Sequence, residues 1–245
     1  MANIGFSTQC LGMSSMPLEE RIKFYYSLGN NAIELSFRKE VQLNEFVLTP
    51  EIVRNIKKFD YISVHAPWRE VIYKHDKKTD EIIKKLRELC RKIPVQGIVL
   101  HPDVVDDFIH MENSGLPFLF ENMDTRKKIG MYPEHFTKLI KDHSFGFVLD
   151  VQHAYDTDPT MKLARKFISV FGDRLKQMHV AGRTESLRHF PVHISDNKDA
   201  IVEILKLGID VPKILEGLLL ENISQTVSRE LDFVKKYEKN KTLKE

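Results

Sequence analysis

The sequence predicts an α/β protein with a single (β/α)8 barrel domain over residues 1–245. Eight short apolar runs have the length and β-branched content of buried strands. Most intervals between them hold a charged segment with helical spacing, which supplies the crossover that parallel strands require. The chain length suits one barrel of this kind, and no linker or composition shift divides the sequence.

The eight predicted strands are spread over the whole chain. They are expected at residues 3–8, 32–37, 61–67, 96–102, 116–122, 145–150, 175–182 and 213–219. The alternative arrangement is an open doubly wound sheet. The barrel is favoured over it because no glycine-rich phosphate loop follows the first strand.

Three of the intervening segments have clear helical patterns. In residues 80–93, Ile82, Leu86 and Leu89 recur at intervals of three and four residues. A helix is also expected over residues 133–143. The segment 158–172 begins with an acidic residue and a proline and ends at a glycine, which predicts a helix over that range.

The composition is that of an ordinary soluble globular protein. The formal net charge of +2 gives no argument for nucleic acid or membrane binding. Two cysteines, Cys10 and Cys90, fit a reducing compartment without a disulfide framework. The N-terminal sequence lacks the pattern of a secretory signal, and no apolar run approaches the roughly 18 residues of a membrane helix. We therefore expect a cytoplasmic protein with no membrane partner.

Six successive predicted strands finish on an imidazole or a carboxylate. These residues are His65, His101, Glu121, Asp150, His179 and Glu216. In a barrel the carboxyl ends of the strands meet at one face, so the six side chains converge there. Such a cluster would be unpaired or repulsive without a bound cation. The mixture of nitrogen and oxygen donors suits zinc, manganese or iron better than calcium.

Two further residues extend this pattern. His153 follows Asp150 by three positions, and we expect it to serve a neighbouring ion. The alternation in residues 32–37 directs Glu34 inward, toward the barrel mouth. Each residue taken alone has a simpler interpretation, such as a histidine that bonds a backbone carbonyl or a glutamate that pairs with a lysine. The convergence of the set favours a metal site.

Several short motifs carry a resemblance to a known family. They are SVHAPW (63–68), VLHPD (99–103), FLFENM (118–123), VLDVQHAY (148–155), QMHVAGR (177–183), LRHF (187–190) and ILEG (214–217). With these motifs the sequence resembles the xylose isomerase-like superfamily of TIM barrels. Within it the chain looks most like the endonuclease IV family of zinc-dependent apurinic/apyrimidinic endonucleases, also called AP endonuclease family 2.

The resemblance implies a site of up to three zinc ions, two of which share Glu121. Its ligands would be His65 and His101 for the first ion, Asp150, His179 and Glu216 for the second, and His153 and His189 for the third. The chain departs from the family at the third ion, because Leu187 stands where a carboxylate is expected. His193 and Asp196 are alternative donors for that position.

The function that the resemblance implies is phosphodiester hydrolysis by zinc-activated water at abasic sites in damaged DNA. Glu121, Asp150 and Glu216 would be the catalytic carboxylates. The residues expected to contact the substrate are Glu34, Trp68, Arg183 and Arg188.

The alternative function is a sugar isomerase or epimerase of the same superfamily, acting on a small sugar. The resemblance implies one ion for such an enzyme, with manganese as a candidate, and the second set of ligands named above would suffice. Glu121 or Glu216 would then move the proton. The near-neutral charge and the acidic loop 101–107 favour this alternative, whereas His65, His101 and His153 favour the nuclease.

Overall fold

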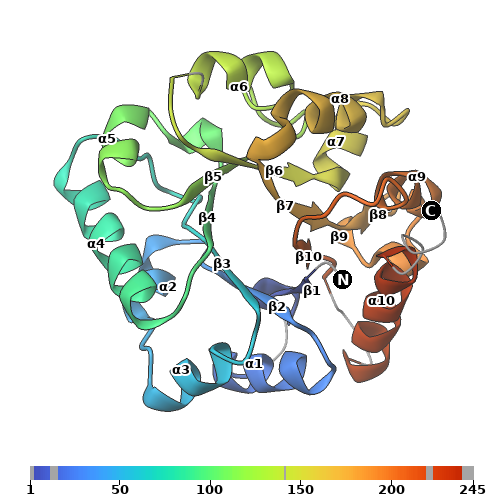
Figure 1. Ribbon diagram of the computed structural model, residues 1–245, viewed down its shortest axis with the longest axis horizontal. Coiled ribbons are helices and arrows are strands. Elements are labelled where there is room, and N and C mark those ends of the chain that lie inside the picture. Colours follow the sequence, from blue (N-terminus) through green and yellow to red (C-terminus); the bar gives the residue numbers. More distant parts are fainter. Residues whose placement is uncertain (1–2, 12–15, 141, 219–222, 239–245) are drawn as a thin grey trace.

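Eight parallel strands close into a barrel with helices around it (Figure 1). The computed structural model describes residues 3–11, 16–140, 142–218 and 223–238. The strands of the barrel are β1 (Ile4–Ser7), β2 (Ala32–Ser36), β3 (Tyr61–His65), β4 (Gly97–Leu100), β5 (Phe118–Glu121), β6 (Gly146–Asp150), β7 (Leu175–Val180) and β10 (Lys213–Leu215). Their order around the barrel is β1-β10-β7-β6-β5-β4-β3-β2. The predicted (β/α)8 barrel is confirmed, and the open sheet is excluded by the β1–β2 and β1–β10 pairings.

Each predicted strand range contains one strand of the barrel. The observed strands are shorter because the terminal residues of most ranges have no ladder partner on the neighbouring strand. The range 175–182 also reaches the start of a second, short strand, β8 (Gly182–Arg183). In the range 213–219, residue 219 lies outside the described residues.

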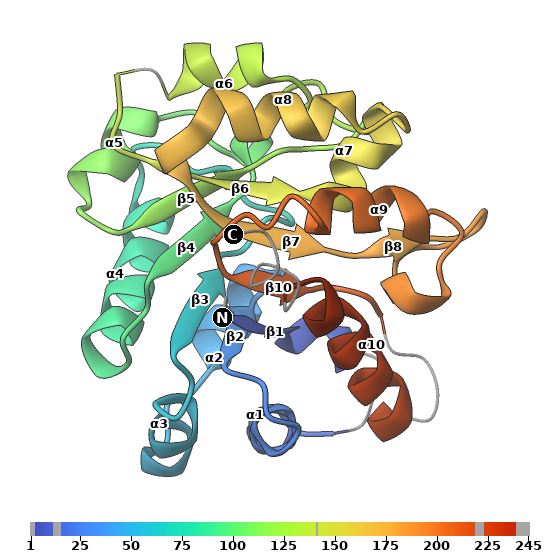
Figure 2. The same cartoon turned by 45° about the vertical axis from the view of Figure 1, so that its right-hand side comes forward.

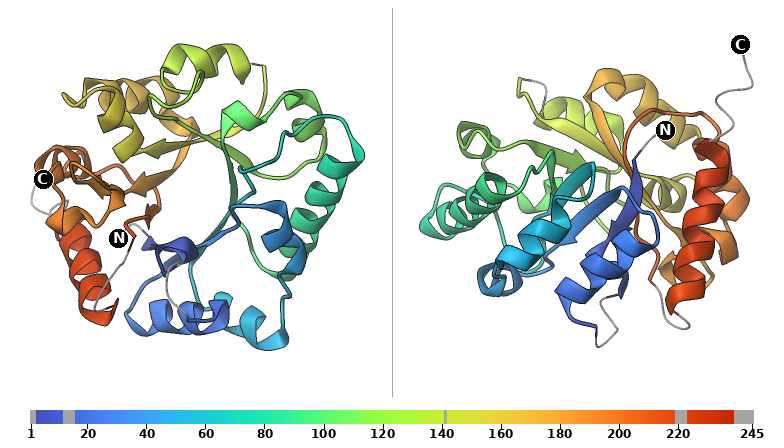
Figure 3. Two further views of the ribbon diagram at one scale, coloured as in Figure 1. Left: turned by 180° about the vertical axis from the view of Figure 1, so that it is seen from behind. Right: turned by 60° about the horizontal axis from the view of Figure 1, so that its bottom comes forward.

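The helices lie between the strands and cover the outside of the barrel (Figure 3). They are α1 (Leu18–Ser27), α2 (Glu40–Glu45), α3 (Pro50–Ile56), α4 (Lys77–Lys92), α5 (Phe108–Asn113), α6 (Pro133–Leu139), α7 (Val151–Thr157), α8 (Lys162–Phe171), α9 (Lys198–Leu205) and α10 (Ile223–Glu238). The prediction for residues 80–93 corresponds to α4, which begins earlier because the Asp76 side chain caps it by accepting from Thr79 N. In the described part of the chain, no helix combines the length and the apolar character that crossing a membrane requires.

Helix α8 begins later than the sequence predicts. The Asp158 carboxylate accepts from the backbone N–H groups of Thr160 and Leu163, at 3.0 and 2.8 Å. Met161 adopts a left-handed conformation with φ of 58°. Asp158 therefore stabilises a turn that precedes α8, rather than the first turn of a helix that starts at residue 158.

A short antiparallel hairpin follows β7. Its strands are β8 and β9 (Arg188–Phe190), and Figure 2 shows β8 continuing outward from β7 beside α9. The 3-10 turn η4 (Val192–Ile194) comes next, and α10 holds it through Glu230. The backbone of Leu218, just after β10, donates to His189 O at 2.6 Å, which docks the hairpin against the end of the barrel.

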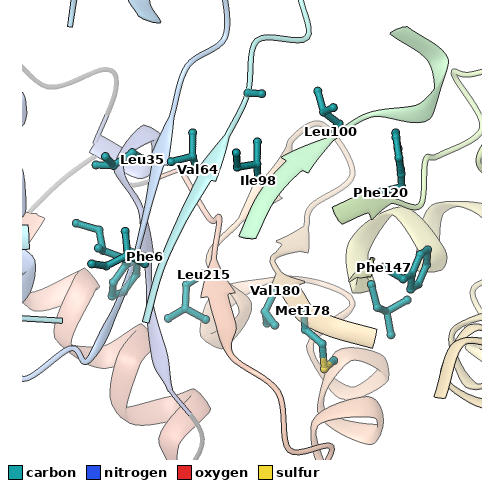
Figure 4. Packing of buried hydrophobic residues seen from close by; sticks show 14 of the residues in the cluster. Phe6, Leu35, Val64, Ile98, Leu100, Phe120, Phe147, Met178, Val180 and Leu215 are labelled. Atoms are coloured by element: carbon teal, nitrogen blue, oxygen red, sulfur yellow. The ribbon is translucent and has the colours of Figure 1, made fainter. Parts of the chain in front are cut away.

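The main core lies between the strands and the helices. Figure 4 shows outward-facing residues such as Leu35, Val64, Phe120 and Phe147 packed in this layer. Phe147 stacks on Phe171 of α8 with ring centroids 4.1 Å apart. Burial of each large side chain of this kind contributes roughly 1.5–3 kcal/mol.

The inside of the barrel is filled by the alternate residues of each strand. Its apolar part comprises two small clusters, Ala32, Tyr61 and Ile214 in one, Val99, Leu119 and Val148 in the other. Because side chains alternate along a strand, the residue two positions later points to the same side. The inward positions that follow these clusters therefore carry the strand-end histidines and carboxylates.

Candidate metal centre

The six strand-end side chains converge on one buried site at the carboxyl end of the barrel. They form two groups whose ligand atoms lie within 4.8 Å of one another. The first group is His65, His101 and Glu121, and the second is Glu121, Asp150, His179 and Glu216. All but Glu216 are buried, and Glu216 is partly buried.

Glu121 lies between the two groups and belongs to both. Its Oε2 faces His65 Nε2 at 3.3 Å and His101 Nε2 at 3.5 Å. Its Oε1 faces His179 Nδ1 at 3.4 Å. The carboxylate thus presents one oxygen to each group, as a ligand shared by two ions would.

The first group has a free imidazole nitrogen directed at Glu121. His65 Nδ1 lies 3.0 Å from Ala66 O. A carbonyl oxygen only accepts, so Nδ1 carries the proton and Nε2 keeps a lone pair. Trp68 packs on the rings of His65 and His101, with centroids 4.3 and 5.3 Å away, and restricts both.

The second group is supported from below by a buried carboxylate. Glu34 Oε2 accepts from Ser63 Oγ at 2.9 Å and from Gln177 Nε2 at 2.8 Å, and it lies 3.2 Å from His179 Nε2. With Nε2 facing Glu34, the other nitrogen of His179 faces Glu121 and Glu216. A carboxylate behind an imidazole in this way fixes the ring and makes it a better ligand.

Asp150 contributes one oxygen to the fold and one to the site. Its Oδ1 accepts from His153 N at 2.7 Å and caps α7, and its backbone is held by two hydrogen bonds with the Asn122 side chain. Its Oδ2 has no hydrogen-bond partner. The end of β6 therefore begins a helix and also directs a candidate ligand into the site.

Without a bound cation, the buried carboxylates of this site lie close to one another, and their pKa values reflect this. Burial raises the pKa of Asp150 to about 7, and burial together with the neighbouring Glu121 raises the pKa of Glu216 well above its usual value. Burial lowers the pKa of His101 to about 4. The pKa of His179 is raised, because Glu216, Glu34 and Glu121 outweigh the opposite effect of burial.

The residues of both groups fit divalent ions. Four buried polar atoms among them lack a hydrogen-bond partner: Glu121 Oε2, Asp150 Oδ2, His179 Nδ1 and His101 Nδ1. Unpaired buried polar atoms are costly, and the first three belong to residues that the second group brings together. Two ions sharing Glu121 would satisfy these three.

His153 and His189 lie at one side of the site without completing a third group. His153 Nδ1 donates to Asn122 O at 2.9 Å, which leaves its Nε2 free, and its ring is 5.4 Å from that of His189. Leu187 is 44% exposed and offers no ligand. The alternative donors are engaged elsewhere, because His193 Nδ1 bonds Glu230 at 2.6 Å and the Asp196 carboxylate accepts from Glu185 N.

The residues predicted to contact substrate occupy different places. Trp68 lines the cavity above the ligands. Glu34 is fully buried beneath them. Arg183 and Arg188 both pair with Asp156, through contacts of 2.8 and 2.9 Å.

Three residues near His153 are candidates for a functional role that the sequence did not indicate. Asp124 lies 3.9 Å from His153 Nε2, Arg126 binds Asp124 through its side chain, and Asp156 holds the two arginines of the hairpin. The two aspartates each follow a candidate ligand by three residues. That spacing is their only signal, and it is too common in a charged sequence to select them.

A cavity of about 1020 Å³ is lined in part by four of the candidate ligands. These four are His65, His101, Glu121 and Glu216, and Trp68 also lines the cavity. Its basic lining residues are Arg21, Arg38, Arg69, Arg126 and Lys127. A cavity that combines acidic candidate ligands with cationic side chains can bind cations and an anionic substrate together.

No protein-family model and no curated protein matches the sequence. Solved structures match its fold over nearly the whole chain. A D-tagatose 3-epimerase-like protein has a TM-score of 0.69 at 16% identity, covering 98% of this chain and 99% of that one. Endonuclease IV from Thermus thermophilus also has a TM-score of 0.69, at 15% identity and with 97% and 99% covered.

A xylose isomerase-like TIM barrel/4-hydroxyphenylpyruvate dioxygenase fusion protein has a TM-score of 0.68 at 17% identity. The match covers 97% of this chain and 43% of the fusion protein. Identities this low establish the fold, and they single out neither the endonuclease nor the epimerase. The chain therefore shares the (β/α)8 barrel fold of these proteins.

Proposed function

We propose that the chain is a two-metal phosphodiester hydrolase that acts on DNA at abasic sites, as the resemblance to endonuclease IV suggests. The observation that carries this proposal is the position of Glu121 between the two ligand groups, one oxygen toward each. An enzyme with a single ion would not need His65 and His101 as additional ligands. The Nε2 atoms of both histidines face the same oxygen of Glu121, at 3.3 and 3.5 Å, and this arrangement supports a second ion.

The ions would be held by the two groups described above, with zinc as the favoured metal for this donor set. Two ions there would supply Lewis-acid chemistry, lowering the pKa of water and neutralising negative charge on phosphoryl oxygens. The carboxylates of Glu121, Asp150 and Glu216 hold and separate the positive charges. Glu34 keeps the ring of His179 in place.

The cavity lining supports a nucleic acid substrate despite the near-neutral net charge. Basic side chains gather at the cavity, where they can bind backbone phosphates. Trp68 presents an aromatic surface beside the ligands, on which a base or sugar ring can stack. Local charge at the site matters more for phosphate binding than the sum over the chain.

A specific observation also favours the alternative, a sugar isomerase or epimerase. The second ligand group has four donors and is complete without the first. One ion there, such as manganese, would leave Glu121 or Glu216 beside the substrate to move a proton. The folds of an epimerase-like protein and an endonuclease match this chain equally well.

Metal content and substrate assays separate the two functions. Bound metal is removed from the full chain with a chelator, and the protein is reloaded with zinc or manganese. The number of ions per chain is then measured by elemental mass spectrometry. Two zinc ions per chain and nicking of a duplex with one abasic-site analogue support the hydrolase, with the matched intact duplex as control. One ion per chain and ketose epimerisation support the alternative. Fully loaded protein that leaves the abasic duplex intact would refute the DNA substrate.

The variant His101→Ala tests the first ion directly. We expect one zinc per chain and a loss of cleavage of at least about a hundredfold, because the shared carboxylate loses its partner ion. His75→Ala is the matched control, since His75 is exposed, stacks on His110 and belongs to neither ligand group. Normal zinc content and activity in His101→Ala would remove His101 from the ligands.

A further inference from the structure

The position where the resemblance implies a third ion has too few donors. Within the described residues, only two groups bring three or more ligand atoms together, and neither contains His153 or His189. The residue two positions before His189 is Leu187, which is 44% exposed. Two imidazoles alone do not make a tetrahedral zinc site.

The carboxylate closest to His153 Nε2 is already bound by arginine. Asp124 Oδ2 lies 3.9 Å from that nitrogen. Arg126 Nε donates to both oxygens of Asp124, at 3.0 and 2.8 Å, and Arg188 approaches Oδ2 to 3.7 Å. The Asp124 side chain is 1% exposed, so its charge is balanced by these guanidinium groups rather than by solvent.

A second buried carboxylate fixes Arg188 in place. Asp156, also 1% exposed, accepts from Arg188 Nε at 2.9 Å and from Arg183 at 2.8 Å, and Gln152 Nε2 donates to it at 2.7 Å. The network thus contains three guanidinium groups, of Arg126, Arg183 and Arg188. They pair with the carboxylates of Asp124 and Asp156, which leaves one net positive charge. A divalent ion placed beside it would be repelled.

Arg126 is the member of this network that lines the cavity together with His153 and His189. Its side chain is 54% exposed. Its bonds to Asp124 engage Nε and one terminal nitrogen, which leaves donors on the outer side of the planar fork. Those donors match an oxygen anion of tetrahedral geometry, such as phosphate.

We propose that a guanidinium network, Arg126 and Arg188 anchored on Asp124 and Asp156, replaces the third ion in this chain, so that the site takes two metals and Arg126 binds a phosphate oxygen. The identity of the anion rests on the proposed function, whereas the number of ions does not. Arg126 contacts the substrate in this arrangement. Arg188 is a positioning residue that acts through Asp124.

The number of zinc ions is the first test. We expect two per wild-type chain by metal analysis and by calorimetric titration of the chelator-stripped protein. The double variant Leu187→Asp/Arg188→Gln restores a carboxylate and removes a guanidinium, and we expect it to bind a third ion. Leu187→Asn/Arg188→Gln is the matched control and should remain at two. Three zinc ions in the wild-type protein would overturn the proposal even if the variants do not fold.

Phosphate binding is the second test and does not depend on cleavage of any substrate. Inorganic phosphate is titrated into the zinc-loaded protein by calorimetry. We expect the Kd to rise about tenfold in Arg126→Gln, in line with the loss of a charged hydrogen bond. Arg165→Gln on α8, which breaks an exposed ion pair with Glu203 of α9, should leave the Kd unchanged, since Arg165 does not line the cavity. An unchanged Kd in Arg126→Gln would refute its role in anion binding.

Discussion

His179 presents its two ring nitrogens to different partners. Nε2 faces the buried Glu34, and Nδ1 faces Glu121 and Glu216 in the candidate site. Glu34 therefore lies behind the site and fixes the orientation of a candidate ligand. This role depends on its negative charge, because a carboxylate accepts from the ring and makes the opposite nitrogen more basic.

The substitution Glu34→Gln keeps the size of the side chain and removes its charge. We expect the zinc affinity of the second ligand group to fall by about 10- to 100-fold, while the first group is less affected. Competition with a chromophoric chelator measures this. Glu51→Gln, at an exposed ion pair with Lys23, is the control. Equal affinities in wild type and Glu34→Gln would show that the charge of Glu34 does not matter.

At the scale of elements, α10 fixes the hairpin that carries His189. Glu230 of α10 is fully buried and accepts from Val192 N at 2.7 Å, His193 N at 3.0 Å and His193 Nδ1 at 2.6 Å. These bonds hold η4, which follows β9 directly. A helix at the end of the chain thereby controls a loop at the mouth of the barrel.

We expect Glu230→Ala to lower the free energy of unfolding by about 2–4 kcal/mol, because the buried Val192 N–H, the partly buried His193 N–H and the His193 ring lose their acceptor. Urea unfolding followed by circular dichroism measures this. Glu203→Ala on α9 is the comparison, since its carboxylate is exposed and should change stability by no more than about 0.5 kcal/mol. A similar loss of unfolding free energy in both variants would contradict this role of the Glu230 hydrogen bonds.

At the scale of the whole molecule, the features that can be predicted from the sequence are those that depend on the alternation of side chains along the strands. The closed barrel follows from the eight strand signals, and the inward direction of His65 and Glu121 follows from the period of two along their strands. Asp124, Arg126 and Glu230 could not be predicted in this way. Their contacts depend on loop conformation and on pairs far apart in the sequence, which no local pattern encodes. The late start of α8 likewise depends on the turn that Asp158 forms.

The charge imbalance at the site predicts how stability depends on pH. Without metal, the folded chain holds protons on Glu216, His153 and His179 at pH values where the unfolded chain has lost them, because their pKa values are raised. The pKa of Asp150, about 7, adds to this effect up to neutral pH. Stability in the presence of a chelator should therefore fall as the pH rises above about 6.5, the ordinary pKa of histidine.

Zinc should reverse this trend, since its ligands bind in their deprotonated forms and the gain on binding grows with pH. Thermal unfolding at pH 6.5, 7.5 and 8.5, with chelator and with zinc, measures both trends. A Tm that rises with pH in the presence of chelator would contradict the raised pKa values.

Each of the six candidate ligands comes from a different strand, and Glu216 follows the last strand to enter the barrel. An incomplete chain that lacks β10 therefore has five of the six donors at most and no closed ring to hold them together. Uptake of the full complement of ions would be a late event in the maturation of the protein, after ring closure. The rate at which a refolding sample acquires zinc should consequently report on the formation of the β1–β10 seam.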